Sequence, residues 1–343
     1  MVRIGTREIE VSNNSLIKMV NIAIIGAGQI GSRHLQAMAQ LEEPAEVQLV
    51  DHSEASLRTA QERFYDVYDS ESKKIELKCR KSIDALFDHI DVAIVATCSD
   101  VRSAVIREVT RKKEVKSFIL EKVLFQTIGE YFEIAEVLTK KNIPAWVNCW
   151  MREKDFYKKL KTQLNLDEKI QMTVEGSLWG MGGNSIHFID LFSYLTDCKD
   201  FSFVDCRLGR EIVDSKRNGY KEFFGRMLGK NSKGDLLSLE CSNQGNRQYR
   251  IRVINGTQIH EITDCVDHVV YKFFDGEKES IDIVDIPFQS QTTHRIVSQI
   301  FNMRYCDLTP YHDSIKLHLP LIEVLIEHLQ KVTGSAFAAC PIT

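Results

Sequence analysis

The sequence predicts an α/β protein with a doubly wound parallel sheet in its first half and an α+β domain with an open, mostly antiparallel sheet in its second half. Apolar runs alternate with helical patterns as far as residue 149, which is typical of βαβ units. From residue 150 onward, turn signals such as Asn255-Gly256 and Asp275-Gly276 join the strands and indicate antiparallel hairpins. We therefore expect domains at 1–149 and 150–343, with residues 1–18 as an additional N-terminal arm.

Each predicted strand is a short apolar run, and each predicted helix carries apolar residues at spacings of three and four. In the first half the strands are expected at 21–25, 47–50, 91–96, 117–120 and 145–148, and the helices at 32–41, 53–65, 82–88, 102–112 and 128–142. In the second half the strands are expected at 170–178, 202–208, 236–241, 248–254 and 268–274, and the helices only at 184–195, 290–303 and 312–331.

The composition narrows the class of protein. Apolar residues make up 43% of the 343 residues and the formal net charge is -4, so nothing indicates a nucleic-acid or membrane partner. No apolar run approaches the roughly 18 residues of a membrane span. Nine cysteines without a Cys-x-x-Cys pair favour reduced thiols and a cytoplasmic location. Cys265 and His268 are too few for a zinc site, so no metal is expected.

The turn IIGAGQIG, residues 24–31, predicts a dinucleotide site. Gly26 allows the tight turn, Gly28 lets the backbone approach a pyrophosphate at the helix N-terminus, and Gly31 lets helix and strand pack closely. Asp51 follows Gly31 by 20 residues; it can accept both ribose hydroxyls of NAD and would repel the 2′-phosphate of NADP. NAD is therefore favoured over NADP. The alternative is a structural glycine turn with Asp51 as a helix cap.

Three later segments carry a resemblance to a known family. They are ILEKVLFQTIGEYFEIAEVLTKKNIPAWVNCWMR (119–152), GMGGNSIHFIDLFSYL (180–195) and the closing helices that begin with PFQSQTTHRIVSQIF. With the glycine turn, in this order, they resemble the Gfo/Idh/MocA family of NAD(P)-dependent oxidoreductases, which includes glucose-fructose oxidoreductase and inositol 2-dehydrogenase. The resemblance implies a Rossmann domain, hydride transfer at a sugar-like carbon, and a homodimer or homotetramer formed through the C-terminal sheet. The expected cofactor contacts are Gly26, Gly28, Gln29, Ile30, Gly31, Asp51, Thr97 and Glu121.

The chain departs from the family pattern at three positions. Val123 replaces the proline of the family's Glu-Lys-Pro motif, which here reads Glu121-Lys122-Val123. Gly183 stands where many dehydrogenases of the family carry an acid four residues before a histidine, and Arg102 stands where a histidine is preferred. The cofactor site thus matches the family, while the acid–base set is incomplete by its commonest pattern.

Lys122, His187 and Asp190 are the catalytic candidates. Lys122 follows a strand at the carboxyl edge of the sheet, where ligands bind, and can stabilise alkoxide charge on the reacting oxygen. His187 is expected to titrate near neutral pH, which suits a general base. Asp190 lies one helical turn further on and is expected to orient the substrate or the imidazole. The alternatives are a surface lysine, a packed helix histidine and a helix-surface acid.

Asn148, Arg152 and Asn184 are the candidate substrate contacts. Asn148 and Arg152 flank the crossing between the domains. Arg152 can hold a carboxylate or phosphate by two hydrogen bonds, and an interdomain salt bridge is the alternative. Asn184 can contact a substrate hydroxyl or cap a helix. Trp179 is expected in the core rather than stacked on a ligand.

These observations predict an NAD(P)-dependent oxidoreductase whose partner is a small sugar-like substrate: a sugar, a polyol or a nucleotide-linked sugar, in the setting of bacterial polysaccharide metabolism. The alternative hypothesis is a catalytically silent NAD-binding sensor or partner subunit, which the departures at Val123 and Gly183 favour.

Overall fold

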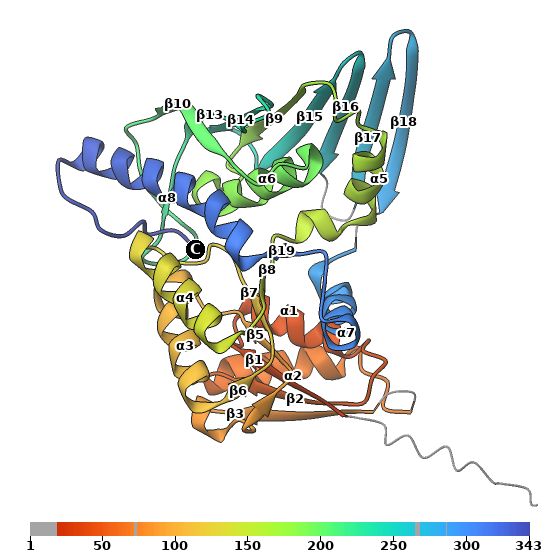
Figure 1. Ribbon diagram of the computed structural model, residues 1–343, viewed down its shortest axis with the longest axis vertical. Coiled ribbons are helices and arrows are strands. Elements are labelled where there is room, and N and C mark those ends of the chain that lie inside the picture. Colours follow the sequence, from red (N-terminus) through yellow and green to blue (C-terminus); the bar gives the residue numbers. More distant parts are fainter. Residues whose placement is uncertain (1–18, 72–73, 265–267, 286) are drawn as a thin grey trace, which may run out of the picture.

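Two large β-sheets form two lobes (Figure 1). The first sheet is built mainly from the first half of the chain but includes β19 (Thr309–Pro310) from the second half. The structure is a computed structural model that describes residues 19–71, 74–264, 268–285 and 287–343. The expected N-terminal arm, residues 1–18, lies outside these ranges, and so does Cys265. The described chain ends between the two lobes (Figure 1).

The first sheet has seven strands in the order β19-β8-β7-β5-β1-β2-β3. All neighbours run parallel except β19, which pairs antiparallel with β8. The strands are β1 (Val20–Ile25), β2 (Ala45–Val50), β3 (Ile75–Arg80), β5 (Val92–Val95), β7 (Phe118–Leu120), β8 (Ala145–Val147) and β19 (Thr309–Pro310). The prediction of a parallel, doubly wound sheet is confirmed. It missed β3, a partly exposed edge strand in which polar residues interrupt the apolar signal.

Helices cover both faces of this sheet, because its strands are apolar on both sides. On one face lie α1 (Gln29–Met38), α2 (Glu54–Tyr65) and α7 (Thr293–Met303), and on the other lie α3 (Ser99–Lys112) and α4 (Ile128–Lys141) (Figure 1). In β1, Ile22 and Ile24 belong to the core under the first group, whereas Ala23 and Ile25 belong to the core under the second. Helices α1 and α3 begin three residues earlier than predicted. Their first turns do not carry apolar residues at the helical spacing of three and four, so the sequence pattern starts later than the helix.

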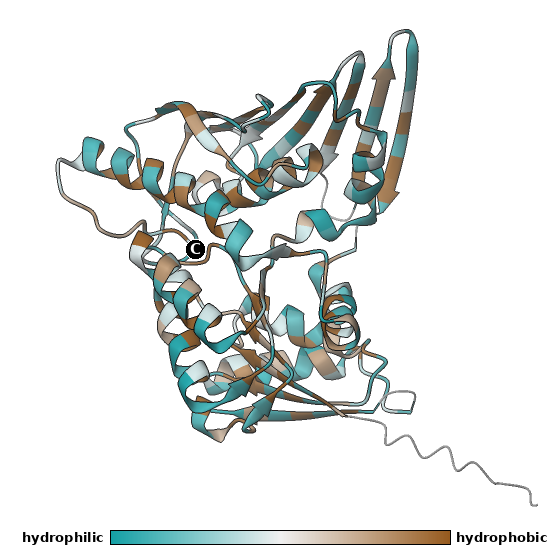
Figure 2. Cartoon of the chain, in the orientation of Figure 1, coloured by the Kyte–Doolittle hydropathy of each residue, from teal (hydrophilic) through white to brown (hydrophobic). Residues whose placement is uncertain are grey.

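The second sheet has eight strands in the order β10-β13-β14-β9-β15-β16-β17-β18. Its neighbours are antiparallel except for the parallel pair β14–β9, so the prediction of an open, mostly antiparallel sheet is confirmed. The strands are β9 (Ile170–Ser177), β10 (Ser202–Leu208), β13 (Gly225–Lys230), β14 (Leu236–Ser242), β15 (Gln248–Asn255), β16 (Gln258–Asp264), β17 (His268–Asp275) and β18 (Lys278–Asp285). Figure 2 shows hydrophilic and hydrophobic residues alternating along these strands, and β15 alternates exposed with buried side chains. One face of the sheet therefore lies open.

The sequence missed β13, β16 and β18, which lack a clean alternation of apolar residues; β18 is exposed at seven of its eight positions. It also missed the charged helix α5 (Asp155–Gln163). The other elements of this half are α6 (Met181–Thr196), α8 (Tyr311–Thr333) and the small hairpin of β11 (Val213–Asp214) and β12 (Lys221–Glu222). Short elements complete the chain: η1 (Ile83–Ala85), β4 (His89–Ile90), β6 (Glu114–Val115), η2 (Trp150–Glu153) and η3 (Gln289–Gln291).

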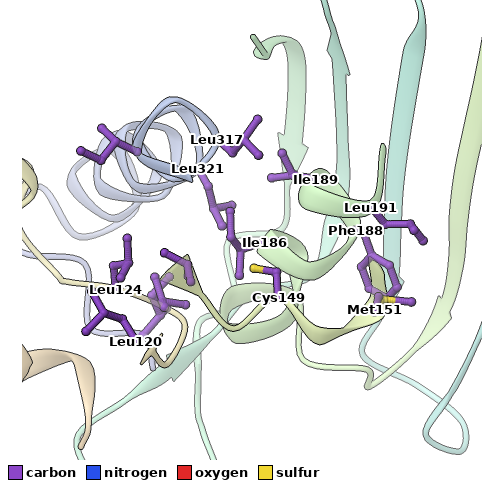
Figure 3. Packing of buried hydrophobic residues seen from close by; sticks show 14 of the residues in the cluster. Leu120, Leu124, Cys149, Met151, Ile186, Phe188, Ile189, Leu191, Leu317 and Leu321 are labelled. Carbon is purple, nitrogen blue, oxygen red and sulfur yellow. The ribbon is translucent and has the colours of Figure 1, made fainter. Parts of the chain in front are cut away.

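A single apolar core joins the two lobes. Figure 3 shows Leu120 at the end of β7 and Leu124 in the loop after it on the side that faces Ile186 of α6, and Leu317 and Leu321 of α8 belong to the same cluster. Helix α6 is buried at 14 of its 16 residues. This packing fixes the first turn of α6 above the carboxyl ends of β5 and β7. No helix in the described ranges is long and apolar enough to cross a membrane.

Candidate active site

The glycine turn between β1 and α1 is shaped by close backbone packing. Gly26 has a φ of +100°, which favours glycine. A Cβ on Gly31 would lie 1.7 Å from the carbonyl oxygen of Gly26, so only glycine fits there. A Cβ on Gly28 would meet no atom within 4 Å. The space beside Gly28, at the N-terminus of α1, is therefore open to a phosphate group.

Asp51 braces this turn. Its Oδ2 accepts the backbone N–H of Ala27 at 2.7 Å, and its Oδ1 accepts that of Ser53 at 2.8 Å. Ser53, rather than Asp51, caps α2 by accepting the N–H of Ser56 at 3.2 Å. The two bonds occupy only half of the roughly four acceptor positions of a carboxylate. Asp51 therefore has a structural role and keeps the capacity to accept ribose hydroxyls.

A cavity of about 630 Å³ opens at the carboxyl ends of β1, β2 and β5, and Gly26, Gly28, Asp51 and Thr97 are among its lining residues. The Oγ1 atom of Thr97 is buried and has no hydrogen-bond partner among the described residues. An open glycine turn, an acid at the end of β2 and an unpaired hydroxyl fit the pyrophosphate and ribose groups of a dinucleotide.

Two further residues at this cavity were not predicted. Lys81 lines its edge directly after β3, and its Nζ pairs with Glu54 at 2.8 Å. It escaped prediction because β3 did. Tyr220 reaches the cavity from the second lobe and donates its hydroxyl to Asp100 at 2.7 Å; only the folded chain brings these two together.

Gln29 and Ile30 form the first turn of α1 beside the open space at Gly28. The side chain of Gln29 accepts a hydrogen bond from Arg63 at 3.0 Å. Both residues can offer backbone N–H groups to an anion at this helix end.

Glu121 and Asn148 belong to a buried hydrogen-bond network. Glu121 Oε1 lies 2.9 Å from His34 Nε2 and accepts N–H groups from Asn148 at 2.5 Å and Gln289 at 3.1 Å. Burial opposes ionisation of Glu121, but His34 and Asn148 outweigh it and lower the pKa to about 2. The two side chains, predicted as cofactor and substrate contacts, thus point at each other and tie α1 to the Lys122 loop.

Lys122 is not a free surface lysine. Its Nζ crosses from the first lobe to the second and donates to the carbonyl oxygen of Gly183 at 3.0 Å and to Asn184 Oδ1 at 3.3 Å. Burial lowers the pKa of Lys122. Asn184, one of the predicted substrate contacts, lies inside α6 and donates its own Nδ2 to the carbonyl of Trp179 at 2.7 Å. The structure therefore joins two predicted site residues directly.

Arg102 holds the loop that carries Lys122. Its buried guanidinium donates to the carbonyl oxygens of Thr97, Val123 and Leu124. Burial without a paired carboxylate lowers the pKa of Arg102 to about 10. The peptide bond between Lys122 and Val123 is cis. The residue that departs from the family pattern at position 102 thus connects the cofactor cavity to the Lys122 loop.

His187 and Asp190 are buried on α6, and the structure corrects two expectations about them. Burial, assisted by the charge of Lys122, lowers the pKa of His187 well below its ordinary value, so the imidazole is neutral at pH 7 rather than titrating there. Its Nδ1 has no partner among the described residues. Asp190 does not orient His187, because its Oδ1 accepts the Thr309 hydroxyl and lies 3.6 Å from Arg152 Nη1.

Arg152 pairs with an acid of its own predicted domain, and Trp179 lies in the core as the sequence predicted. Arg152 also donates to Thr309 of β19, so it links η2 to α6 and to the first sheet. Trp179 is buried and donates its indole N–H to the carbonyl of Glu240 at 2.9 Å.

The last described residues form part of the same region. The N–H of Cys340 donates to the carbonyl of Gln126 at 2.8 Å, and Thr343 Oγ1 accepts the N–H of Ser99 at 3.2 Å. A Cβ on Gly183 would lie 2.8 Å from the backbone oxygen of Thr343. Segment 340–343 therefore bridges the start of α3 and the first turn of α6, and no sequence motif indicated this.

The fold and the site define a two-lobed dinucleotide-binding protein with a lysine between its lobes. Residues 20–149 match the oxidoreductase family with an NAD-binding Rossmann fold, Gfo/Idh/MocA. The match covers the first lobe and confirms there the resemblance seen in the sequence. No curated protein matches the sequence.

Solved structures show the same fold over most of the chain. UDP-N-acetylglucosamine 3-dehydrogenase GnnA from Acidithiobacillus ferrooxidans is 13% identical with a TM-score of 0.68, covering 90% of this chain and 97% of that protein. KijD10, a 3-ketoreductase from Actinomadura kijaniata in complex with NADP and TDP-benzene, is 13% identical with a TM-score of 0.66, covering 90% and 97%. A super-repressor mutant of Gal80p from Saccharomyces cerevisiae is 14% identical with a TM-score of 0.66, covering 92% and 96%.

Proposed function

We propose that the protein is an NAD(P)-dependent oxidoreductase that transfers hydride to or from a CH–OH carbon of a sugar, polyol or nucleotide-linked sugar. The observation that carries this proposal is Lys122, whose ammonium group reaches from the family-matched Rossmann lobe to the first turn of α6. Dehydrogenase and ketoreductase structures with the same fold support it.

The chain's own residues divide the chemistry between them. Bound NAD(P) supplies the hydride donor or acceptor. Lys122, with a pKa lowered by burial, can hydrogen-bond the substrate oxygen and stabilise the charge that develops on it. Two of its three donor positions are used by Gly183 and Asn184, which leaves one for a ligand. Neutral His187 can accept a proton or a hydrogen bond through Nδ1, which lacks a protein partner among the described residues.

We propose NAD as the preferred cofactor. Asp51 at the end of β2 favours ribose hydroxyls over a 2′-phosphate. Lys81 at the cavity edge pairs with Glu54 at 2.8 Å, a carboxylate that competes with a phosphate for its ammonium group. Calorimetric titration with NADH and NADPH tests this directly. Tighter binding of NADPH would refute the preference.

Replacing Lys122 tests the reaction. In Lys122→Met we expect turnover to fall by about 10²-fold or more, while NADH affinity stays within about twofold, because the lysine lies on the substrate side. Lys140→Met, the same change at an exposed position of α4 that pairs with Glu136, is the matched control. Turnover is followed by nicotinamide absorbance with paired donor and acceptor sugars, so that a tightly held, recycled cofactor is also detected. Unchanged turnover in Lys122→Met would refute the assignment.

The second candidate is a catalytically silent NAD-binding sensor or partner subunit. The observation that favours it is that Lys122 already has protein acceptors at Gly183 and Asn184; a repressor protein also shares the fold. Tight NADH binding with no turnover of any sugar pair, and no stabilisation by nucleotide sugars in a thermal-shift screen, would favour this candidate.

We further propose that the open face of the second sheet forms a homodimer or homotetramer and that the protein works in the cytoplasm. Ile281 and Ile283 on β18 are 57% and 71% exposed, which is unusual for isoleucine and typical of association surfaces. Light scattering of wild type and Ile283→Lys tests the assembly. A monomeric wild type would refute it.

A further inference from the structure

We propose that Glu222, on β12, is a positioning residue of the active site: its carboxylate holds the glycine-rich first turn of α6 and favours the charged form of Lys122, which that turn receives. This inference deepens the proposed function and rests on it. No sequence motif singles out Glu222, which lies far from the other site residues along the chain.

The carboxylate of Glu222 lies against Gly180, which precedes α6, and against Gly182 and Gly183 in the first turn of that helix. Its Oε2 accepts the backbone N–H of Gly182 at 2.9 Å. A Cβ on Gly180 would lie 3.4 Å from Oε1, and a Cβ on Gly182 would lie 3.2 Å from Oε2. Gly180 also has a φ of +83°, which favours glycine, and a Cβ on Gly182 would lie 3.0 Å from Ile342 Cγ2 as well. The small residues of this turn leave room for the carboxylate to reach its backbone.

The same turn receives Lys122. Nζ of Lys122 donates to the carbonyl of Gly183 and to Asn184 Oδ1, directly after the residue that Glu222 holds. Lys122 from the first lobe and Glu222 from the β11–β12 hairpin thus converge on one helical turn. Movement of this turn would move both acceptors of the lysine.

Glu222 also supplies a carboxylate beside the position that lacks an acid of its own. Its Oε1 lies 3.9 Å from the point where a Cβ on Gly183 would be. The backbone oxygen of Thr343 lies 2.8 Å from the same point, so an acid at position 183 would collide with segment 340–343. A carboxylate brought in from another strand avoids that collision.

The charges around the pair are consistent with this role. Burial raises the pKa of Glu222, and Lys122 opposes that rise; by reciprocity the carboxylate favours the protonated form of Lys122. The other ionisable groups that act on the two are Glu121, Cys149, Arg102, Arg217, His187 and His318 around Lys122, and Arg247 near Glu222. Of these, Glu121 is the carboxylate that most opposes the effect of burial on Lys122, and it also takes part in the His34 network. Glu222 adds a second carboxylate from the other lobe.

The test compares Glu222→Gln, which keeps an oxygen to accept the Gly182 N–H but removes the charge, with Glu222→Ala, which removes both. Asp214→Asn is the matched control, because Asp214 is an exposed carboxylate of the same hairpin. The pKa of Lys122 is measured without substrate, from the pH dependence of its acetylation by acetic anhydride, quantified by peptide mass spectrometry. Turnover is measured against pH with whichever sugar pair the wild type accepts.

We expect the labelling midpoint of Lys122 in Glu222→Gln to move to lower pH by about half a unit or more, and the corresponding limb of kcat/KM to move with it. Glu222→Ala should in addition lower kcat about tenfold or more, with a smaller change in KM, since the turn is no longer held. Asp214→Asn should match the wild type. An unchanged midpoint in Glu222→Gln would overturn the inference, even if Glu222→Ala loses stability. Because labelling needs no turnover, absence of any substrate would count against the proposed function alone.

Discussion

Two glycine-to-alanine substitutions three residues apart should separate the structural role of the glycine turn from its binding role. At Gly31, the new Cβ would lie 1.7 Å from the oxygen and 2.8 Å from the carbon of the Gly26 carbonyl. The backbone must move by more than an ångström, which costs about 3 kcal/mol, at the upper end of overpacking effects. At about 2–4 °C per kcal/mol for a domain of this size, the Tm should fall by about 6–12 °C.

Gly28→Ala should do the opposite. Gly28 has a φ of -64°, which alanine adopts without strain, and its Cβ would meet no atom within 4 Å. The Tm should stay unchanged or rise slightly, because alanine restricts the unfolded chain. The new methyl group would, however, occupy the space that a pyrophosphate needs at the N-terminus of α1. We expect the NADH affinity to fall by at least about tenfold, or about 1.4 kcal/mol.

Scanning calorimetry and calorimetric titration with NADH measure the two effects on the same samples. Wild-type NADH affinity in Gly28→Ala would refute the placement of the pyrophosphate over this turn. Wild-type Tm in Gly31→Ala would refute the packing argument, whatever the effect on binding. The two outcomes are independent of each other.

Three further predictions follow from buried contacts. The pKa of Glu121 is about 2 against an ordinary 4.5. Ionised Glu121 should therefore contribute about 3 kcal/mol to the free energy of unfolding above pH 4.5, and this contribution is lost as the pH falls towards 2. In urea unfolding, Glu121→Gln should abolish this part of the pH dependence. In Arg102→Lys, the lysine ammonium group cannot bond all three carbonyl oxygens that the guanidinium contacts. The free energy of unfolding, measured in urea, should therefore fall by about 2–3 kcal/mol. In Gly183→Ala the new Cβ would lie 2.8 Å from the backbone oxygen of Thr343, so the Tm should fall by several degrees. Gly129→Ala, at a helical position with open space, is the control and should keep the wild-type Tm. Equal Tm values for the two variants would contradict this prediction.

The sequence predicted the parts of the molecule that local patterns determine. The order strand, glycine turn, helix and acid in residues 20–51 identifies a Rossmann unit, because each residue acts on its near neighbours. Strands such as β9 and β14 were predicted from short apolar runs bounded by turn signals. In contrast, β18 is an exposed edge strand that, among the described strands, pairs only with β17, and α5 is a short charged helix, so their own residues carry little apolar periodic signal.

The site could be predicted only in part for the same reason. Lys122 and Asn184 were both named, and the structure joins them. Glu222 and segment 340–343 were not, because they reach the site through contacts between residues far apart in the chain. The neutral state of His187 was also beyond the sequence, since it depends on burial rather than on the identity of its neighbours in the chain.

The energetic cost of the buried polar groups favours a catalytic site over a catalytically silent one. His187 Nδ1 and Asp190 Oδ2 are buried without a partner among the described residues, and such atoms typically cost about 1–3 kcal/mol each. The Glu222 carboxylate is held largely out of solvent with a raised pKa, which adds to that cost. A protein that only held a dinucleotide would gain stability by replacing these groups with apolar ones, since the cavity around Gly28 and Thr97 does not include them. His187 and Glu222 both act electrostatically on Lys122, and a ligand held by Lys122 would supply the hydrogen bond that His187 Nδ1 lacks.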